Sequence, residues 1–290
     1  MNFRDLKYVQ ALAKLGRFQD AAKACGVSQP TLSAQVKKLE DELGVAIFER
    51  KSRGILLTSF GEEFLKGCNR ILTEYEDLKE LAKLEKSPES MRLQIGSFPT
   101  LANYYFPYLI PYIKKLYPCL DLILHEDKSA TLIENLDSGE LDFILLAAPC
   151  PDLNFQSERL FVDPFYCAMS KDNPLTNNNE LSLDMLLNQK ILLLDEGHCL
   201  RDQVMSLCEL PQNGHETYRG TSLETVRQMV RLDAGITLIP KIACRKDDDL
   251  VYLPLKTPSP QREILAVWRT SSPRSNFFRK LACILKKMKI

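Results

Sequence analysis

Two cysteines nine residues apart, Cys199 and Cys208, are the side chains of this sequence best suited to redox chemistry. Before them an apolar run ends and Gly197 turns the chain, so that Cys199 comes near the start of a predicted helix. A helix N-terminus stabilises negative charge, and His198 and Arg201 can add positive charge beside it. We therefore expect Cys199 to react as a thiolate.

The spacing of these cysteines sets a condition on any disulfide between them. Nine residues of helix would separate their α-carbons by roughly 13–14 Å and place them on opposite faces. A disulfide tolerates a separation of at most about 7 Å. If both cysteines lie on one helix, joining them requires that helix to unwind, which is the behaviour of a two-state redox element.

Other interpretations of the same residues stay open. Cys208 falls on the apolar stripe of its helix, where a cytoplasmic cysteine is usually an inert small hydrophobic residue. His198 by itself would be typical of a hydrogen-bonded structural histidine. A metal site made of His198, Cys199, Cys208 and His215 is a weak alternative, because its spacing matches no usual zinc finger. No cofactor is predicted.

Composition places these cysteines in a chain of two or three domains. The 290 residues are 45% hydrophobic and 26% charged, with 38 Lys and Arg balancing 38 Asp and Glu, as in ordinary soluble globular proteins. No apolar run approaches the roughly 18 residues of a membrane span, and the first thirty residues lack a secretion signal. Nine cysteines without CxxC spacing argue against a disulfide scaffold or zinc ribbon and favour a reducing cytoplasm.

The basic excess of the chain lies at its N-terminus, where residues 1–60 hold ten Lys and Arg against six Asp and Glu. Here the spacing predicts a helix over Phe3–Leu15, a short helix over Gln19–Cys25, and a third helix that begins after Ser28 as its N-cap. The third helix turns an apolar stripe inward and small, polar and basic side chains outward. This pattern indicates a helix-turn-helix, although a plain helical hairpin has the same spacing.

After the third helix, two short stretches, Gly44–Arg50 and Arg53–Thr58, flank a basic turn and predict a two-stranded wing. The family motifs of this region are Ala21-Ala22, Val27 to Ser33, Lys38-Leu39-Glu40, Leu43-Gly44, Phe48-Glu49-Arg50 and Leu57-Thr58. They resemble the winged helix-turn-helix of LysR-type transcriptional regulators. The resemblance implies base-edge contacts by Gln29, Pro30 and Ser33, and contacts to the DNA backbone by Thr31, Lys37, Arg50 and Arg53.

A long helix is predicted from Gly61 to Lys86, a stretch without proline and roughly 39 Å long at 1.5 Å per residue. Apolar or small residues recur in it at heptad spacing: Phe64, Cys68, Ile71, Tyr75, Leu78 and Ala82. LysR-type regulators dimerise through such a helix, so we favour pairing between two chains. The alternative is an amphipathic helix that lies on its own domain.

In the last two hundred residues, short apolar runs alternate with helical stretches after a hinge-like segment at 87–90. This alternation predicts an α/β domain with a largely parallel sheet. The resemblance implies a two-lobed effector domain similar in fold to periplasmic binding proteins, so the predicted fold is α/β and multidomain. The predicted bounds are 1–58 for the DNA-binding domain, 59–87 for the linker helix and 88–290 for the effector domain, with lobes at about 88–162 plus 268–290 and about 163–267.

Over nearly its whole length the chain is similar to the peroxide-sensing members of that family. The likeness is carried by Leu194 to Cys208 and by Met1-Asn2, Arg4-Asp5-Leu6, Leu39 to Val45, His125-Glu126, Leu136 to Gly139 and Thr221 to Thr225. By that resemblance Cys199 is the peroxidatic thiol and Cys208 the resolving thiol. The resemblance further implies peroxide binding by Thr100, Ser129, His198 and Arg269, with support from Arg201 and Asp202. Ser129 stands where the family usually has threonine.

The resemblance implies a regulator rather than an enzyme: a cytoplasmic activator of oxidative-stress genes that binds promoter DNA as a homodimer or homotetramer. The other partners it implies are hydrogen peroxide, RNA polymerase and a thiol reductant of the glutaredoxin or thioredoxin type, and no membrane. Two alternatives stay open. One is a LysR-type regulator that binds a small organic ligand in the cleft between the lobes, with idle cysteines. The other is a thiol peroxidase with an incidental DNA-binding domain.

Overall fold

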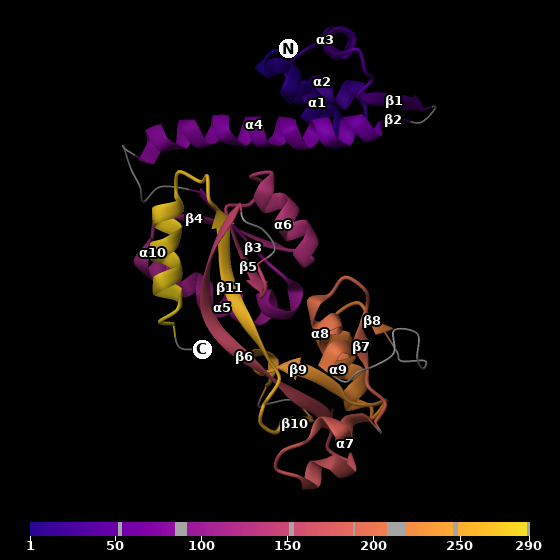
Figure 1. Cartoon of the computed structure of the whole chain (residues 1–290), viewed down its shortest axis with the longest axis vertical. Coiled ribbons are helices and arrows are strands. Elements are labelled where there is room, and N and C mark those ends of the chain that lie inside the picture. Colours follow the sequence, from indigo (N-terminus) through magenta and orange to yellow (C-terminus); the bar gives the residue numbers. More distant parts are fainter. Residues whose placement is uncertain are drawn as a thin grey trace. The chain divides into compact units, whose positions relative to one another are not determined.

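The chain forms two compact units, shown in the cartoon of Figure 1. The computed structural model describes residues 1–51, 54–84, 92–150, 154–187, 189–207, 219–245 and 249–288. The first unit is Met1–Pro88 with Asp137–Glu140, and the second is Glu89–Leu136 with Leu141–Ile290. Among the helices in the described ranges, none combines the length and apolar character that crossing a bilayer requires.

The first unit contains the predicted helix-turn-helix and wing. Its elements are α1 (Phe3–Leu15), α2 (Phe18–Ala24), α3 (Gln29–Leu43), β1 (Phe48–Lys51), β2 (Gly54–Leu57) and α4 (Ser59–Leu84). The start of α1 is fixed by a capping box, in which the Asn2 side chain accepts from the Asp5 N–H and the Asp5 carboxylate accepts from the Asn2 N–H. The α1 bounds match the prediction, and α2 begins and ends one residue early.

The recognition helix α3 is held at its start, along one face and at the wing. The Ser28 hydroxyl accepts a hydrogen bond from the Thr31 N–H at 3.3 Å, as predicted for an N-cap. The predicted apolar stripe is buried at Leu32, Val36 and Leu39. The Glu40 carboxylate accepts from the backbone N–H of Ile47 at 2.8 Å and of Phe48 at 3.0 Å. Because of these two bonds, the first wing strand is fixed to α3.

The junction between the wing and α4 is closely packed. The Thr58 hydroxyl donates to the Ala46 carbonyl at 2.8 Å and accepts from the Gly61 N–H at 2.9 Å. A Cβ atom at position 61 would lie 2.1 Å from the Ile47 carbonyl oxygen. Since backbone cannot give way at that distance, only glycine fits here.

The predicted heptad residues of α4 divide between two environments. Cys68 is buried and packs with Phe64 in the core that α4 shares with α1. Ile71 and Leu78 are 45% and 66% exposed. One portion of the apolar surface of α4 therefore covers its own unit, and another portion is exposed; pairing between two chains stays a prediction.

The second unit is built on a mixed seven-stranded sheet in the order β10-β6-β11-β5-β3-β4, with β9 also paired to β6. The strands are β3 (Arg92–Ser97), β4 (Asp121–Glu126), β5 (Phe143–Ala147), β6 (Phe155–Ser170), β9 (Thr237–Pro240), β10 (Leu250–Pro254) and β11 (Gln261–Arg269). Strand β3 is parallel to β4 and β5, whereas β11 is antiparallel to β5 and β6, and β9 and β10 are antiparallel to β6. The prediction of a largely parallel sheet is therefore wrong, because two long strands run through the unit in opposite directions.

Helices cover this sheet in two lobes that share β6: its first part pairs with β11, and its last part pairs with β9 and β10 (Figure 1). The helices are α5 (Pro99–Leu116), α6 (Ser129–Asp137), α7 (Leu183–Leu187), α8 (Cys199–Leu207), α9 (Leu223–Arg231) and α10 (Ser275–Leu285), with the 3-10 turns η1 (Pro174–Asn177) and η2 (Lys241–Ala243). In the first lobe Phe143 packs against Trp268 and Phe278. A separate core in the second lobe surrounds the short parallel pair β7 (Leu193–Leu194) and β8 (Arg219–Gly220).

Candidate functional site

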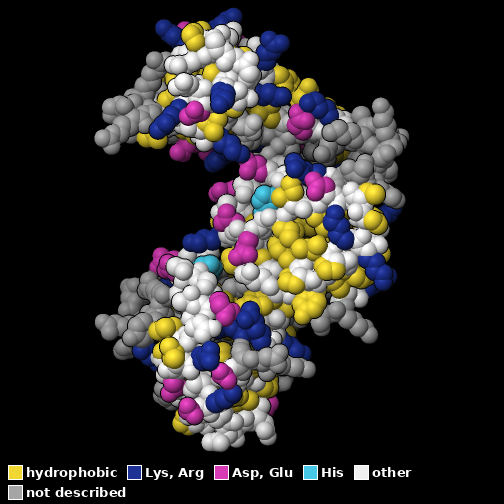
Figure 2. Space-filling view, turned by 180° about the vertical axis from the view of Figure 1, so that it is seen from behind, with side chains coloured by type: hydrophobic (Ala, Val, Ile, Leu, Met, Phe, Trp, Pro, Cys, Tyr) yellow, Lys and Arg dark blue, Asp and Glu magenta, His cyan; other side chains and the backbone are white. Residues whose placement is uncertain are grey.

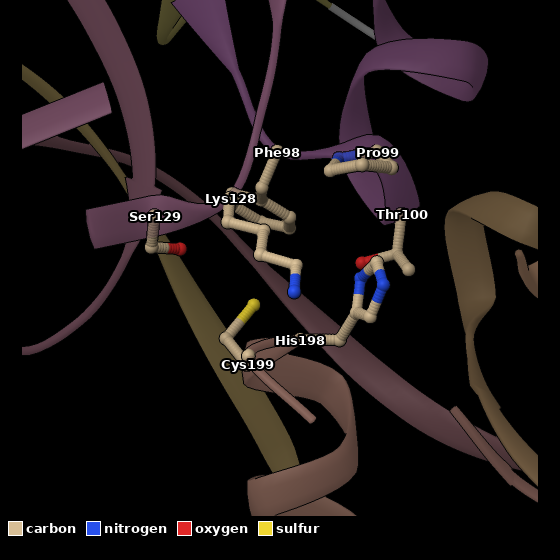
Figure 3. A pocket seen from close by; sticks show the side chains of 8 residues that line it. Phe98, Pro99, Thr100, Lys128, Ser129, His198 and Cys199 are labelled. Carbon is tan, nitrogen blue, oxygen red and sulfur yellow. The ribbon is translucent and has the colours of Figure 1, made fainter. Parts of the chain in front are cut away.

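The N-termini of three helices of the second unit meet at one small pocket, shown in Figure 3. Helix α5 begins at Pro99, α6 at Ser129 and α8 at Cys199. The lining residues are Phe98, Pro99, Thr100, Lys128, Ser129, Gly197, His198 and Cys199. The pocket therefore combines one thiol, two hydroxyls, an imidazole and an ammonium group, and the free N–H groups of the helix starts favour negative charge there.

Cys199 is half-buried at the first position of α8. Burial raises the pKa of its thiol above the ordinary value of 9.0, and the Asp202 carboxylate adds to this. Arg262, a hydrogen bond with Ser129 and the Leu200 N–H act in the opposite direction and lower the pKa, but burial outweighs them. Burial therefore opposes the thiolate that the sequence predicts for Cys199. The thiol form prevails at neutral pH, and the groups around it stabilise the thiolate once it forms.

A buried arginine orients Thr100, one of the predicted peroxide-binding residues. The Arg262 guanidinium donates to the Thr100 hydroxyl and to the Thr100 carbonyl, both at 3.1 Å. The same guanidinium donates twice to one oxygen of the Asp163 carboxylate, Oδ2, from Nη2 at 2.9 Å and from Nε at 3.1 Å. All three residues are at most 3% exposed. Because the Thr100 oxygen already accepts a hydrogen bond, its own O–H is left to donate into the pocket.

The sequence prediction placed Arg269 at the peroxide pocket, and the structure places it elsewhere. Arg269 is buried at the end of β11 and donates to the carbonyl oxygens of Leu136 and Leu141 at 2.7 and 2.9 Å. The arginine that lowers the pKa of Cys199 is Arg262, seven residues earlier on the same strand. A signal for it was present in the sequence, since Arg262 and Asp163 are opposite charges in two apolar strands and prove to be register partners.

The positive charge at the pocket comes from Lys128, which sequence reasoning missed. Burial lowers the pKa of His198, and the nearby Lys128 ammonium lowers it further, although Asp195 opposes this. His198 is therefore neutral at pH 7 and offers hydrogen bonds rather than charge. The Lys128 Nζ donates to the Glu196 carbonyl at 2.9 Å. The sequence did hold a signal for Lys128, because this lysine directly precedes Ser129, which was predicted to bind peroxide.

The remaining predicted redox residues lie on α8 or beyond it. Arg201 is largely buried and faces Glu196, with Nη2 3.7 Å from Oε1. Asp202 is exposed in the first turn. The apolar stripe is confirmed at Leu200 and Val204, which are both buried. Cys208 and His215 lie outside the described residues. Within the described ranges no group of three His, Cys, Asp or Glu side chains could hold a metal ion.

The predicted DNA-contacting residues whose side chains the structure describes all lie on α3. Gln29, Pro30, Thr31 and Lys37 are exposed on α3, and Ser33 is partly exposed beside them. The side chain of Arg50 and the whole of Arg53 lie outside the described residues. Figure 2 shows several Lys and Arg side chains exposed on this unit. Exposed polar side chains on a helix that follows a capped turn have the arrangement needed to enter a major groove.

Comparison with known families agrees with both the helix-turn-helix of the first unit and the sheet domain of the second unit. Residues 3–62 match the bacterial regulatory helix-turn-helix protein of the lysR family, and residues 86–288 match the LysR substrate binding domain. The chain is 42% identical to the DNA-binding transcriptional dual regulator OxyR of Escherichia coli K12, over 97% of this chain and 94% of that protein. It is 37% identical to the hydrogen peroxide-inducible genes activator of Haemophilus influenzae, over 97% of this chain and 95% of that protein.

Solved structures give the same result. Full-length OxyR C199D from Pseudomonas aeruginosa superposes with a TM-score of 0.83 at 35% identity, covering 100% of this chain and 96% of that chain. The oxidized form of OxyR superposes with a TM-score of 0.61 at 38% identity, covering 67% of this chain and 94% of that chain. On its sequence, its two domains and its fold, the chain belongs to the LysR family of bacterial transcriptional regulators.

Proposed function

We propose that this protein is a DNA-binding transcriptional regulator that senses hydrogen peroxide through Cys199 and stores the signal as a Cys199–Cys208 disulfide. The observation that carries the proposal is the position of Cys199 at the start of α8, where it meets Thr100, Ser129 and the charge of Arg262. Relatives that are 42% and 37% identical over nearly the whole chain are named as OxyR and as a hydrogen peroxide-inducible genes activator.

The chemistry begins with the small thiolate fraction of Cys199. Its sulfur attacks one oxygen of hydrogen peroxide, the O–O bond breaks, and hydroxide leaves and is protonated to water. Sulfur is thereby oxidised to the sulfenic acid. The O–H of Thr100 and the hydroxyl of Ser129 would hold the peroxide, and neutral His198 would donate a hydrogen bond to the departing oxygen.

The second step forms the disulfide. The Cys208 thiolate attacks the Cys199 sulfur, the S–O bond breaks, and hydroxide leaves and is protonated to water. Because α8 is helical from Cys199 to Leu207, the two sulfurs meet only when this helix unwinds. A dithiol reductant of the thioredoxin or glutaredoxin type would return the two electrons and restore the helix.

The size of the pocket favours peroxide over the organic ligand of the alternative hypothesis. Its empty space is about 180 Å³ even when the opening to solvent is included. Sites for drug-sized organic ligands span about 300–1,000 Å³. A peroxide molecule is scarcely larger than water, and the hydroxyls and the imidazole beside Cys199 are groups that could hydrogen-bond to it.

In this proposal the protein acts in the cytoplasm. It binds promoter DNA as a dimer of dimers and activates oxidative-stress genes through RNA polymerase. The exposed apolar residues Ile71 and Leu78 of α4 support pairing with a second copy. Four recognition helices would then bind one promoter region. Unwinding of α8 in each effector domain would change the spacing between these helices. In this proposal the peroxide reaction is a signal rather than an enzymatic turnover.

The test is a peptide map of fully reduced full-length protein after one equivalent of hydrogen peroxide. Trypsin releases residues 191–201, which contain Cys199, and residues 202–219, which contain Cys208. We expect these two peptides to be joined by a disulfide and the other cysteines to stay reduced. Recovery of both peptides unmodified, with the LysR fold intact, would overturn peroxide sensing and leave a regulator with another effector.

A further inference from the structure

Lys128 is the one lining residue of the Cys199 pocket that carries a full positive charge. It precedes α6, is exposed to solvent, and caps that helix by accepting a hydrogen bond from Leu132 at its carbonyl. Its side chain turns back toward the thiol: Figure 3 shows the ammonium group between Cys199 and His198. The Nζ atom donates to the Glu196 carbonyl at 2.9 Å, in the turn that leads into α8.

No carboxylate in the described part of the chain lies within 4.0 Å of the Lys128 ammonium, so its charge is not cancelled by an ion pair. The carboxylate of neighbouring Asp127 accepts from the Lys128 backbone N–H at 2.7 Å instead. The Glu196 carboxylate faces Arg201 at 3.7 Å. Arg262, the other cation near the thiol, is buried and ion-paired with the Asp163 carboxylate, so it is not available at the mouth of the pocket. The net positive charge at the mouth of the pocket therefore comes from Lys128.

Gly197 is matched to this lysine. A Cβ atom at position 197 would lie 2.9 Å from the Lys128 Nζ and 3.0 Å from its Cδ, and the backbone there has φ +86°. Glycine adopts this conformation at little cost and leaves the space that the lysine side chain fills. The turn before Cys199 thus brings the ammonium group close to the reacting sulfur.

We infer that Lys128 lets this pocket also use anionic peroxides, that is, peroxides in which one oxygen carries a negatively charged acid group, and raises their rate of reaction with Cys199. The inference rests on the proposed function, because it names a second class of oxidant for the same thiol. An ammonium at the mouth attracts such an anion, and the three helix N-termini and the Thr100 and Ser129 hydroxyls can hold its oxygens. Neutral hydrogen peroxide gains nothing from the long-range attraction.

The reaction with an anionic peroxide can be written with peroxymonosulfate, which serves as the probe. The Cys199 thiolate attacks the terminal hydroxyl oxygen of the probe, and the S–O bond forms as the O–O bond breaks. Cys199 becomes the sulfenic acid and sulfate leaves with both electrons of the broken bond. Unlike hydroxide, sulfate needs no proton to leave, which suits a pocket whose histidine is neutral.

The experiment compares second-order rate constants for Cys199 oxidation by peroxymonosulfate and by hydrogen peroxide, using the full-length protein and quenching with an alkylating reagent. The ratio of the two constants is the readout. Lys128→Gln removes the charge but keeps an amide donor, and Lys128→Arg keeps the charge. Lys115→Gln is the matched control, because Lys115 is an exposed lysine at the far end of α5.

We expect Lys128→Gln to lower the ratio by at least about threefold, the factor that Coulomb's law gives for unit charges about 6 Å apart in water. Lys128→Arg and Lys115→Gln should keep the ratio within about twofold, and salt should lower it in the wild type but not in Lys128→Gln. An unchanged ratio, or equal losses with both oxidants, would overturn the inference and leave Lys128 a structural residue. If hydrogen peroxide formed no Cys199–Cys208 disulfide in the wild type, that result would instead overturn the proposed function.

Discussion

Helix α3 carries the predicted DNA contacts and helix α8 carries the sensing cysteine, and the two helices are anchored very differently. Helix α3 has 15 residues, an N-cap at Ser28 and a buried apolar stripe, and Glu40 fixes it to the wing. Helix α8 has nine residues and buries Leu200 and Val204. Two buried polar atoms of α8, Arg201 Nε and Gln203 Oε1, have no hydrogen-bond partner within the described residues.

This difference fits what each helix has to do. A helix that reads DNA must present its side chains in one fixed geometry. A helix that reports oxidation must rearrange at low cost, and each buried polar atom without a partner destabilises the folded form by about 1–3 kcal/mol. Low local stability is therefore a property that the sensing segment requires and the reading segment cannot tolerate.

The largest expected effect is the complete loss of the peroxide response when the sensing thiol is removed. Cys199→Ser should bind DNA like the reduced protein and form no disulfide with Cys208, because serine is not oxidised by peroxide. Footprinting of a promoter fragment with and without peroxide measures this. Cys119→Ser, which removes an exposed cysteine elsewhere, should respond normally. A peroxide-dependent footprint in Cys199→Ser would show that α8 is not the sensing element.

The next largest effect concerns the anchoring of α3. Leu32→Ala empties a site that is 0% exposed and should destabilise the first unit by about 2–5 kcal/mol. We expect loss of binding to a duplex selected in vitro with the wild-type protein, measured by fluorescence anisotropy, and an unchanged rate of Cys199 oxidation. Leu56→Ala, at a half-exposed site of the wing, should have little effect on stability. Full DNA binding by Leu32→Ala would contradict the rigid role given to α3.

The pH dependence of oxidation follows from the raised pKa of Cys199. Only the thiolate reacts. At any pH well below the pKa of Cys199, which lies above 9.0, the thiolate fraction rises about tenfold per pH unit. The rate constant for hydrogen peroxide should therefore increase steadily from pH 6 to pH 9, as measured by rapid-quench alkylation. A plateau that begins below pH 7 would mean that the thiol is a resting thiolate after all.

The smallest predicted effect separates the two arginines of β11. Arg262→Met should slow Cys199 oxidation by about tenfold, because it removes the positive charge that lowers the pKa of the thiol. Asp163→Asn/Arg262→Met avoids leaving a buried carboxylate unpaired and should be equally slow. Arg269→Met, which removes a buried arginine seven residues away, should oxidise at the wild-type rate. Equal slowing by Arg262→Met and Arg269→Met would show that general destabilisation, rather than charge, is responsible.

The first unit was predictable because its signals are local. Capping residues, the turn glycine and the apolar stripe of α3 lie within a few residues of one another, and each has a direct structural meaning. The bounds of α1 matched, and Ser28 caps α3 as expected.

The pocket was only partly predictable because its residues come together through strands that are far apart in sequence. Arg262 reaches Thr100 and Asp163 across separations of 162 and 99 residues. Nothing in the sequence near Arg269 indicates that its guanidinium donates hydrogen bonds to two backbone carbonyl groups. The raised pKa of Cys199 depends on how deeply the folded chain buries the thiol, and residue types alone do not contain that information.

The glycine at position 61 has a mechanical consequence. Because α4 touches the backbone of the wing there, with no side chain between them, the two cannot slide past each other. The wing is also hydrogen-bonded to α3 through Glu40, so α4, the wing and α3 are joined by direct contacts. The start of α4, the wing and α3 therefore form one rigid group, so any rotation of α4 about its axis would also reorient the side chains that α3 presents to the DNA.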